Sequence, residues 1–437
     1  MTGPAAADRP ADAAPLWRRS VAGGLAAFAW VALAALAIGA LEWLAAGRPF
    51  GVRLTWKLAG LYLSAFHGGG IRGVSAGLPG DVGIGDVTAL GPELTLHVTF
   101  LVGTAFAGVV LWRAGRRTGR AAGGGWMRSL AWGASVAPPY ALLMFAVTRV
   151  TVLRFPSAGF TEVRPVAVEV VGGALLLGLI AGAAGGAAAA TESEASPEPW
   201  GGRLRAWVAG GWHMTVALVV LAFAGFLVVA GLRSDVSAAY VRAAGRADAA
   251  GAIAAGHHVL LFANQSFLIA APSMGGCVTV EGSGSQPTAL CLRTLTVRPG
   301  FGSTVLPGLT SRTVPLSPLW LLFLLVPLGA TVWGGHVAAA GVPGRGERAL
   351  RGAGGGVVFA VVVLVGEVAS AIVIERPPDG ALLRVGADPL GIGALALAWG
   401  LCGGVLGALM PARRQEPVVD GPPAGDDPDV PPRPTSA

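Results

Sequence analysis

The sequence predicts an all-α protein embedded in a membrane, and three observations point to that class. Hydrophobic residues make up 53% of the 437-residue chain and charged residues only 13%, about half the charged share of soluble domains. The mean hydropathy is +0.65, which leaves too little polar surface for a water-soluble globule. The apolar residues gather in runs of about 20, the length that a helix needs to cross a bilayer while satisfying its own backbone hydrogen bonds.

The net charge of +7 comes almost entirely from arginine, since Lys57 is the only lysine. These arginines lie in short loops between apolar runs, where basic residues set the orientation of a membrane protein. The pattern is therefore a topology signal and not a nucleic-acid-binding patch. We expect membrane lipids as partners, other membrane or envelope proteins as further partners, and no nucleic acid.

Eight apolar runs are long enough to cross the membrane. Two others, 54–67 and 256–271, are shorter and have polar ends, which favours re-entrant or interfacial helices. The eight crossings are expected at about 21–46, 92–112, 129–153, 165–190, 206–231, 317–340, 353–374 and 390–410.

Orientation follows from the arginine-rich loops. Loops 113–128 and 341–352, together with Arg413 and Arg414 after the last run, should face the cytoplasm. Eight crossings plus two dips place all of them on the side of the basic amino terminus. The chain is therefore expected in the cell membrane with both termini in the cytoplasm. The alternative is ten crossings, with each short run as a full span.

The chain divides into two membrane segments with polar tails. Residues 1–17 and 411–437 are rich in Pro, Ala and Asp and are expected to be disordered in the cytoplasm. Residues 18–190 and 206–410 form the membrane segments, and an acidic cytoplasmic linker, 191–205, joins them.

Both membrane segments show the same order of elements: crossing, dip, long outer loop, crossing, basic loop, crossing, crossing. Local sequence agrees, because the run Val-Ala-Gly-Gly opens the first crossing of each segment, at Val21 and at Val208. Pro165 and Pro389 each stand where the last crossing begins. We predict two parallel repeats; the alternative is a chance likeness of two Ala- and Gly-rich sequences.

The outer loops, 68–91 and 272–316, are too long for simple turns, and alternating residues in the second predict short β-hairpins. Cys277 and Cys291 lie in that loop and are expected to form a disulfide. The alternative is two free thiols in a loop of opposite orientation. Cys402 falls inside a crossing and is expected to be a small packing residue.

The order of these features resembles that of the streptophobe-like family of actinobacterial membrane proteins. The residues that carry the resemblance are His67-Gly68, Asn264-Gln265-Ser266, the segment 272–277 and the segment 298–302. The resemblance implies a multi-pass membrane protein and assigns no active residue.

A few polar residues fall within the predicted membrane segments. Glu367 sits near the middle of the seventh predicted crossing, where an ionised carboxylate costs roughly 2.5–3.5 kcal/mol. Arg149, in the third crossing, is its expected partner. With Asn264, Gln265 and His67 these residues form the candidate intramembrane site. It is either a site for a proton or substrate, or a purely structural buried pair.

No catalytic motif, nucleotide-binding loop or metal-ligand spacing is present in the sequence. We therefore expect no enzyme activity, no cofactor and no metal. The predicted function is that of a structural or regulatory membrane protein of the cell envelope. The alternative is a transporter, channel or lipid-translocating protein with its site where the two repeats meet.

Overall fold

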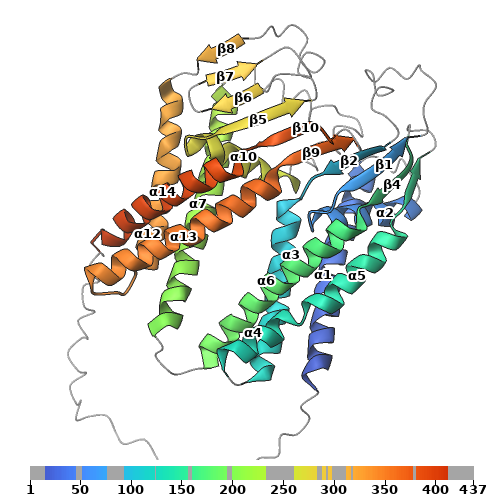
Figure 1. Ribbon diagram of the computed structural model, residues 1–437, viewed down its shortest axis with the longest axis horizontal. Coiled ribbons are helices and arrows are strands. Elements are labelled where there is room, and N and C mark those ends of the chain that lie inside the picture. The colour runs from blue at the N-terminus through green and yellow to red at the C-terminus, as the bar shows by residue number, and fades with distance from the viewer. Residues whose placement is uncertain are drawn as a thin grey trace, which may run out of the picture.

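The computed structural model of the chain describes twelve segments: residues 15–45, 52–75, 93–123, 125–155, 160–193, 199–232, 260–282, 288–291, 294–297, 312–315, 318–376 and 380–411. We call the described residues up to 193 the first half and those from 199 onward the second half. Helices run side by side in two bundles, and strands gather at one end of them (Figure 1).

The first half places two helices before its first strands and one after its last. Its elements are α1 (Leu16–Ala45), α2 (Val52–Ala65), β1 (Ile71–Ser75), β2 (Glu93–His97), α3 (Leu101–Ala122), α4 (Trp126–Ala134), α5 (Ala137–Val150), β3 (Leu153–Phe155), β4 (Phe160–Pro165) and α6 (Ala167–Ser193).

The second half follows a similar order with more strands. Its elements are α7 (Pro199–Leu232), α10 (Phe262–Ser273), β5 (Cys277–Gly282), β6 (Thr288–Cys291), β7 (Thr294–Val297), β8 (Arg312–Pro315), the 3₁₀ helix η2 (Pro318–Leu324), α12 (Leu325–Ala338), α13 (Arg345–Ser370), β9 (Ile372–Arg376), β10 (Gly380–Ala387) and α14 (Pro389–Leu409).

Within the described residues, seven helical stretches are long and apolar enough to cross a membrane. The predicted crossing at 92–112 is the one that does not qualify, which corrects the expected number of eight. It begins as strand β2 and becomes helical only at Leu101. The second part of α3 then carries Arg113, Arg116 and Arg117. Even so, α3 packs along its neighbours, and Ala107 and Leu111 are fully buried.

Two predicted boundaries also change. The expected linker 191–205 is much shorter, because α6 continues to Ser193 and α7 begins at Pro199. The expected third crossing is divided into α4 and α5, where Pro138 and Pro139 occupy the first turn of α5. Proline fits the start of a helix and breaks its interior, which explains the division.

The short helices α2 and α10 each lead directly into a strand, β1 and β5 respectively. They end in the same way. Gly68 and Gly275 have positive φ angles, of 70° and 99°, and the next residue donates its N–H five residues back, to Ser64 O and Ala271 O. This is the Schellman ending, in which glycine adopts a conformation that other residues avoid. The prediction of two short helices beside the crossings is thus confirmed.

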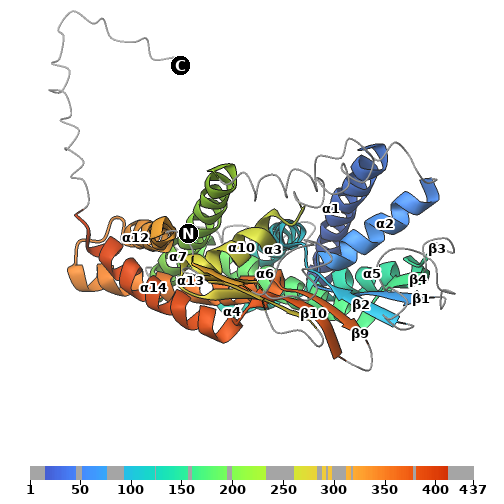
Figure 2. The ribbon, with the colours of Figure 1, turned by 90° about the horizontal axis from the view of Figure 1, so that it is seen from above.

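The strands form one antiparallel sheet in the order β3-β4-β1-β2-β9-β10-β5-β6-β7-β8. The sequence predicts two separate small hairpins, so this single ten-stranded sheet is a correction. Strands β2 and β9 lie in or overlap the runs expected to be crossings, at 92–112 and 353–374, and β3, β4 and β10 lie mostly in the short connections between expected crossings. The sheet extends across the ends of both bundles (Figures 1 and 2).

The predicted disulfide between Cys277 and Cys291 is present, and it joins β5 to β6 with 4.3 Å between the Cα atoms. The two cysteines are direct partners across these antiparallel strands. Cys402 lies in α14 as predicted, but it is exposed, so its expected role in packing is wrong.

Each half packs around its own apolar core, and glycines bring its helices together. In the first half, the carbonyl oxygen of Gly182 would lie 2.3 Å from a methyl group placed on Gly115. In the second half, Gly404 O would lie 2.1 Å from a methyl group placed on Gly335. Such close backbone approach is characteristic of membrane helices with small residues at the contact.

Replacing Gly335 with alanine should therefore destabilise the protein by about 1–3 kcal/mol, because the added methyl group meets backbone that cannot rotate away. Gly329 is the matched control on the same helix, since nothing lies within 4 Å of a methyl group placed there. Gly329→Ala should be neutral or stabilising. Thermal unfolding in detergent micelles measures both, and equal melting temperatures for the two variants would contradict the packing argument.

Candidate functional site at the junction of the two halves

His67 is fixed in the first half by two hydrogen bonds. Its Nδ1 lies 2.7 Å from Leu63 O, and its Nε2 lies 2.7 Å from the Tyr140 hydroxyl. A carbonyl oxygen only accepts, so Nδ1 carries the proton and Nε2 accepts from Tyr140. Burial lowers the pKa of the His67 imidazole to about 4, although the bond to Leu63 acts in the opposite direction. His67 is therefore neutral at physiological pH and links α2 to α5.

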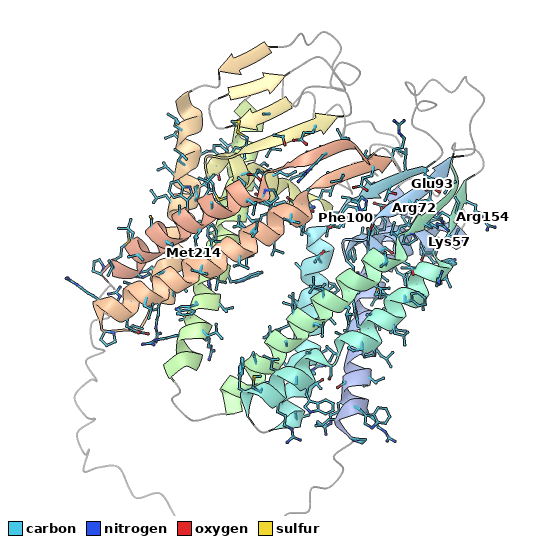
Figure 3. All side chains as sticks on the ribbon, viewed as in Figure 1. Lys57, Arg72, Glu93, Phe100, Arg154 and Met214 are labelled. Atoms are coloured by element: carbon cyan, nitrogen blue, oxygen red, sulfur yellow. A yellow bond between two sulfur atoms is a disulfide. The ribbon has the colours of Figure 1, made fainter. Side chains whose placement is uncertain are left out.

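Two more polar contacts fix α2 against its neighbours. The Tyr62 hydroxyl donates to the Glu42 carboxylate on α1, and Lys57 Nζ donates to Val152 O, 2.7 Å away, just after α5. Figure 3 shows Lys57 with Arg72, Glu93 and Arg154 at the sheet end of the first bundle, far from Met214 in the second. The short helix α2 is thus held on both sides.

Asn264, on the short helix α10 of the second half, bonds directly to the first half. Its Nδ2 donates to Thr99 O at 2.6 Å, and its Oδ1 accepts from Leu101 N at 3.2 Å. The side chain is 1% exposed. Both partners lie where β2 turns into α3, so one amide satisfies two backbone groups across the junction. Gln265, the next residue, is only partly buried and lies beside this contact.

The sheet joins the halves at the same place. Strands β2 and β9 pair with Thr95 opposite Glu375, Leu96 opposite Ile374 and His97 opposite Val373. Among the described strands this is the only pairing between the halves.

His97 places its imidazole ring between two carboxylates beside the ladder. Its Nδ1 lies 3.2 Å from Glu169 Oε2, and its Nε2 lies 3.3 Å from Glu375 Oε2. Glu169 belongs to the first half, at the start of α6, and also accepts the Gly70 N–H at 2.7 Å. Glu375 belongs to the second half. A neutral imidazole has one N–H, so it donates to only one of the two carboxylates, whereas the imidazolium donates to both.

Glu367 lies beside this junction, one turn before the end of α13, and not in mid-helix as predicted. The side chain is 1% exposed. Neither carboxylate oxygen has a hydrogen-bond partner among the described residues. The adjacent Gly366 faces the ring of Phe267 on α10. Glu367 is therefore enclosed where α13 meets the helix that carries Asn264.

The predicted pairing of Glu367 with Arg149 is wrong. The Arg149 guanidinium stacks on the Phe145 ring, 4.9 Å from its centroid, within the first half. The pairing was expected because the third and seventh crossings occupy equivalent places in the two predicted repeats. The halves instead meet through β2, β9 and α10, which leaves Arg149 on another side of its bundle.

The predicted site residues are therefore distributed over the molecule. Asn264 and Glu367 lie near the junction, whereas His67 lies within the first bundle. Four further polar partners were not evident from the sequence: Tyr140, Glu42, Glu169 and Glu375. One signal was available for Glu169, since an acidic residue in the first turn of a helix is favoured to bind free backbone N–H groups.

Among the described residues, no three His, Cys, Asp or Glu side chains are grouped so as to hold a metal ion. The seven apolar helices and their arrangement define the chain as a multi-pass membrane protein. Comparisons with protein-family models, with curated proteins and with solved structures found no match.

The buried His67 predicts a loss of stability in acid. Above about pH 6.5 the imidazole is neutral in both the folded and the unfolded chain, so pH has no effect through this group. Between pH 6.5 and about 4 only the unfolded chain binds the proton, and the free energy of unfolding should fall by about 3 kcal/mol in total.

The second half supplies a matched variant for this prediction. Met274 stands before Gly275 as His67 stands before Gly68, and phenylalanine differs from Tyr140 only in lacking the hydroxyl that bonds to His67. The double variant His67→Met/Tyr140→Phe should fold and lose this part of the acid sensitivity. Melting temperatures from pH 7 to pH 4 decide the matter, and an unchanged acid slope in the double variant would count against His67 as its source.

Proposed function

We propose that the chain is a structural or regulatory protein of the cell envelope, which spans the cell membrane and carries its sheet on the outer face. The observation behind this proposal is the ten-stranded sheet that covers the ends of both bundles. Its outer position is supported by the disulfide in β5 and β6, because disulfides persist in oxidising compartments. The arginines at 113–120 lie in the second part of α3, and those at 345–351 lie in the first turns of α13. Both groups are therefore at the helix ends opposite the sheet, as expected of cytoplasmic loops.

We further propose that the two halves arose by duplication and are parallel repeats. The strands of the two halves follow the same order in the sheet, β3-β4-β1-β2 in the first half and β9-β10-β5 followed by β6 to β8 in the second. Strands β3 and β9 each follow the next-to-last long helix of their half, β4 and β10 precede the last helix, and β1 and β5 follow the short helix. The first helices agree as well. A methyl group on Gly24 would lie 2.8 Å from Val136 O, and one on Gly211 would lie 2.8 Å from Gly355 O. These glycines are the ones in the two Val-Ala-Gly-Gly runs.

The proposed partners follow from the two surfaces. The outward-facing apolar side chains of the spanning helices suit membrane lipids, and the sheet suits other membrane or envelope proteins. Neither a catalytic role nor nucleic-acid binding is proposed. We also propose that the chain is related to the streptophobe-like family, on the basis of the order of its sequence features alone.

A transporter, channel or lipid-translocating protein is the second candidate, and Glu367 is the observation that favours it. A buried carboxyl without a partner among the described residues is costly inside a membrane and is often functional. Its place beside the junction of the halves agrees with transporter folds, whose sites lie between repeats.

The proposed orientation can be tested with single cysteines in a Cys402→Ser background. Glu281 on β5 and Arg117 on α3 are both exposed and lie at opposite ends of the molecule. Glu281→Cys should react with a membrane-impermeant maleimide applied to intact cells. Arg117→Cys should react only after lysis. The reverse pattern would place the sheet in the cytoplasm and refute the envelope proposal.

The proposed function can be tested by complementation of a strain that lacks the chain. We expect that strain to be more sensitive to detergent and lysozyme than its parent. Glu367→Gln should restore resistance, because the carboxylate is not needed for a structural role. Asn264→Leu, which leaves Thr99 O and Leu101 N without their bonds across the junction, should restore it poorly.

Membrane immunoblots must show equal amounts of each variant in this test. A deletion strain as resistant as its parent would refute the structural role. Failure of Glu367→Gln at normal abundance would favour the transport alternative instead.

A further inference from the structure

The carboxyl of Glu367 is enclosed by packed side chains. Glu367 shares the buried face of α13 with Phe359, Val363 and Ser370, and its carboxyl has no hydrogen-bond partner in the described part of the chain. An ionised carboxylate in such a place needs a counter-charge or water, whereas a carboxyl that carries a proton is neutral and tolerates burial far better.

The charged and titratable groups on the helices and strands around α13 do not supply that counter-charge. Helix α10 carries none among its residues. Near the sheet end, Asp388 and Arg384 are exposed, and Asp388 binds Gly391 N at the start of α14. At the same end, β9 carries Arg376 and Glu375, of which Glu375 lies 3.3 Å from His97 of β2, and β5 carries the exposed Glu281. None of these groups bonds to Glu367, whose carboxylate oxygens have no hydrogen-bond partner among the described residues. The other groups are distributed along the rest of the helices: Arg345, Glu347, Arg348 and Arg351 in the first turns of α13, Arg203, Arg205 and His213 on α7, His336 on α12, and Arg113, Arg116, Arg117 and Arg120 on α3.

The corresponding position in the first half is filled by a residue whose polar group is satisfied within its own helix. Gly133 and Gly352 make the same close contact with a glycine of α6 and of α14, and Thr148 and Glu367 each follow by fifteen residues. Thr148 is 5% exposed, and its hydroxyl donates to Phe145 O at 2.7 Å within its own helix. A threonine at this position is therefore buried with its hydroxyl hydrogen-bonded, whereas Glu367 is buried with a carboxyl that has no hydrogen-bond partner among the described residues.

We propose that Glu367 is a proton-binding site, which holds a proton in the packed state of the second half and releases it when α13 and α10 separate. Release creates a negative charge that the packed interface does not solvate, so proton occupancy and packing of α10 are coupled. Because α10 also carries Asn264 to the first half, the coupling reaches the junction. The transport alternative rests on the same residue, and the proton is the ligand proposed for it here, but proton binding by Glu367 requires no transport.

The test uses the full chain in detergent micelles. Infrared difference spectra between acidic and alkaline pH should contain the C=O stretch of a buried protonated carboxyl, and Glu367→Gln should remove it. Glu281→Gln, which alters an exposed carboxylate on β5, is the matched control and should leave that band unchanged.

Thermal unfolding gives a second readout. If the folded chain keeps the proton that the unfolded chain releases, stability is full in acid and falls as pH rises. The melting temperature of the wild-type chain should therefore fall toward alkaline pH relative to Glu367→Gln. Glu367→Thr, which copies the first half, should melt at least as high as the wild type at pH 8.

Three results would overturn the inference. The first is the absence of a protonated-carboxyl band that depends on Glu367, and the second is an equal slope of melting temperature against pH in the wild type and Glu367→Gln. The third is a melting temperature below that of the wild type at every pH in both Glu367→Gln and Glu367→Thr. The last result would show that the carboxylate is a structural partner. Proteoliposomes separate the two proposals, because the Glu367-dependent band without proton flux would support the site and exclude proton-coupled transport.

Discussion

Backbone hydrogen bonding at the ends of the helices determines how the two halves are held together. A chain that leaves a membrane helix must satisfy its N–H and C=O groups, and here the connecting segments do so by pairing as strands. Pairing within one half alone would leave β2 as an open edge, and open edges invite uncontrolled association. The second half fills that edge with β9. Asn264 and the contacts of His97 with Glu169 and Glu375 then reinforce the same line.

The apolar parts of the junction are smaller than the cores on either side of it. Each half has its own cluster of buried residues, and Leu260 is the buried second-half residue that joins the first-half cluster. Packing within each bundle is close, through glycines such as Gly182 and Gly404. Contacts between the bundles are concentrated at the sheet end. A change at the junction is therefore expected to alter how the bundles are joined before it alters either bundle.

Local signals in the sequence were sufficient for the helices and insufficient for the sheet. Apolar runs reveal spanning helices because each run must match the bilayer by itself. The Cys277–Cys291 disulfide was also a local inference. Strand β9 was hidden because Ile372, Val373 and Ile374 read as the end of an apolar helix, and nothing near them identifies β2 as their partner. Register between distant strands is decided by tertiary packing.

The polar residues show the same limit. Glu367 was expected near the helix centre because the apolar run extends over about 353–374, whereas α13 begins at Arg345 and ends at Ser370. Arg149 was expected nearby because the third and seventh crossings occupy equivalent places in the two predicted repeats. Tyr140 was invisible as a partner of His67, since its role depends on how α2 is placed against α5. The sequence showed which polar side chains would need hydrogen-bond partners in the membrane. Which residues became those partners depended on the packing of helices that are distant in the sequence.

The join between β2 and β9 uses different surfaces of the two halves, so it is heterologous and not a two-fold contact. Under the proposed duplication, this asymmetry bears on how the two halves could change. In a symmetric pair, one ancestral substitution at the contact would appear twice and meet its own copy. Here each substitution meets an unlike surface, so the halves are free to diverge. Lys57 and Asn264, which anchor the two short helices to different neighbours, fit the divergence that the proposed duplication would allow.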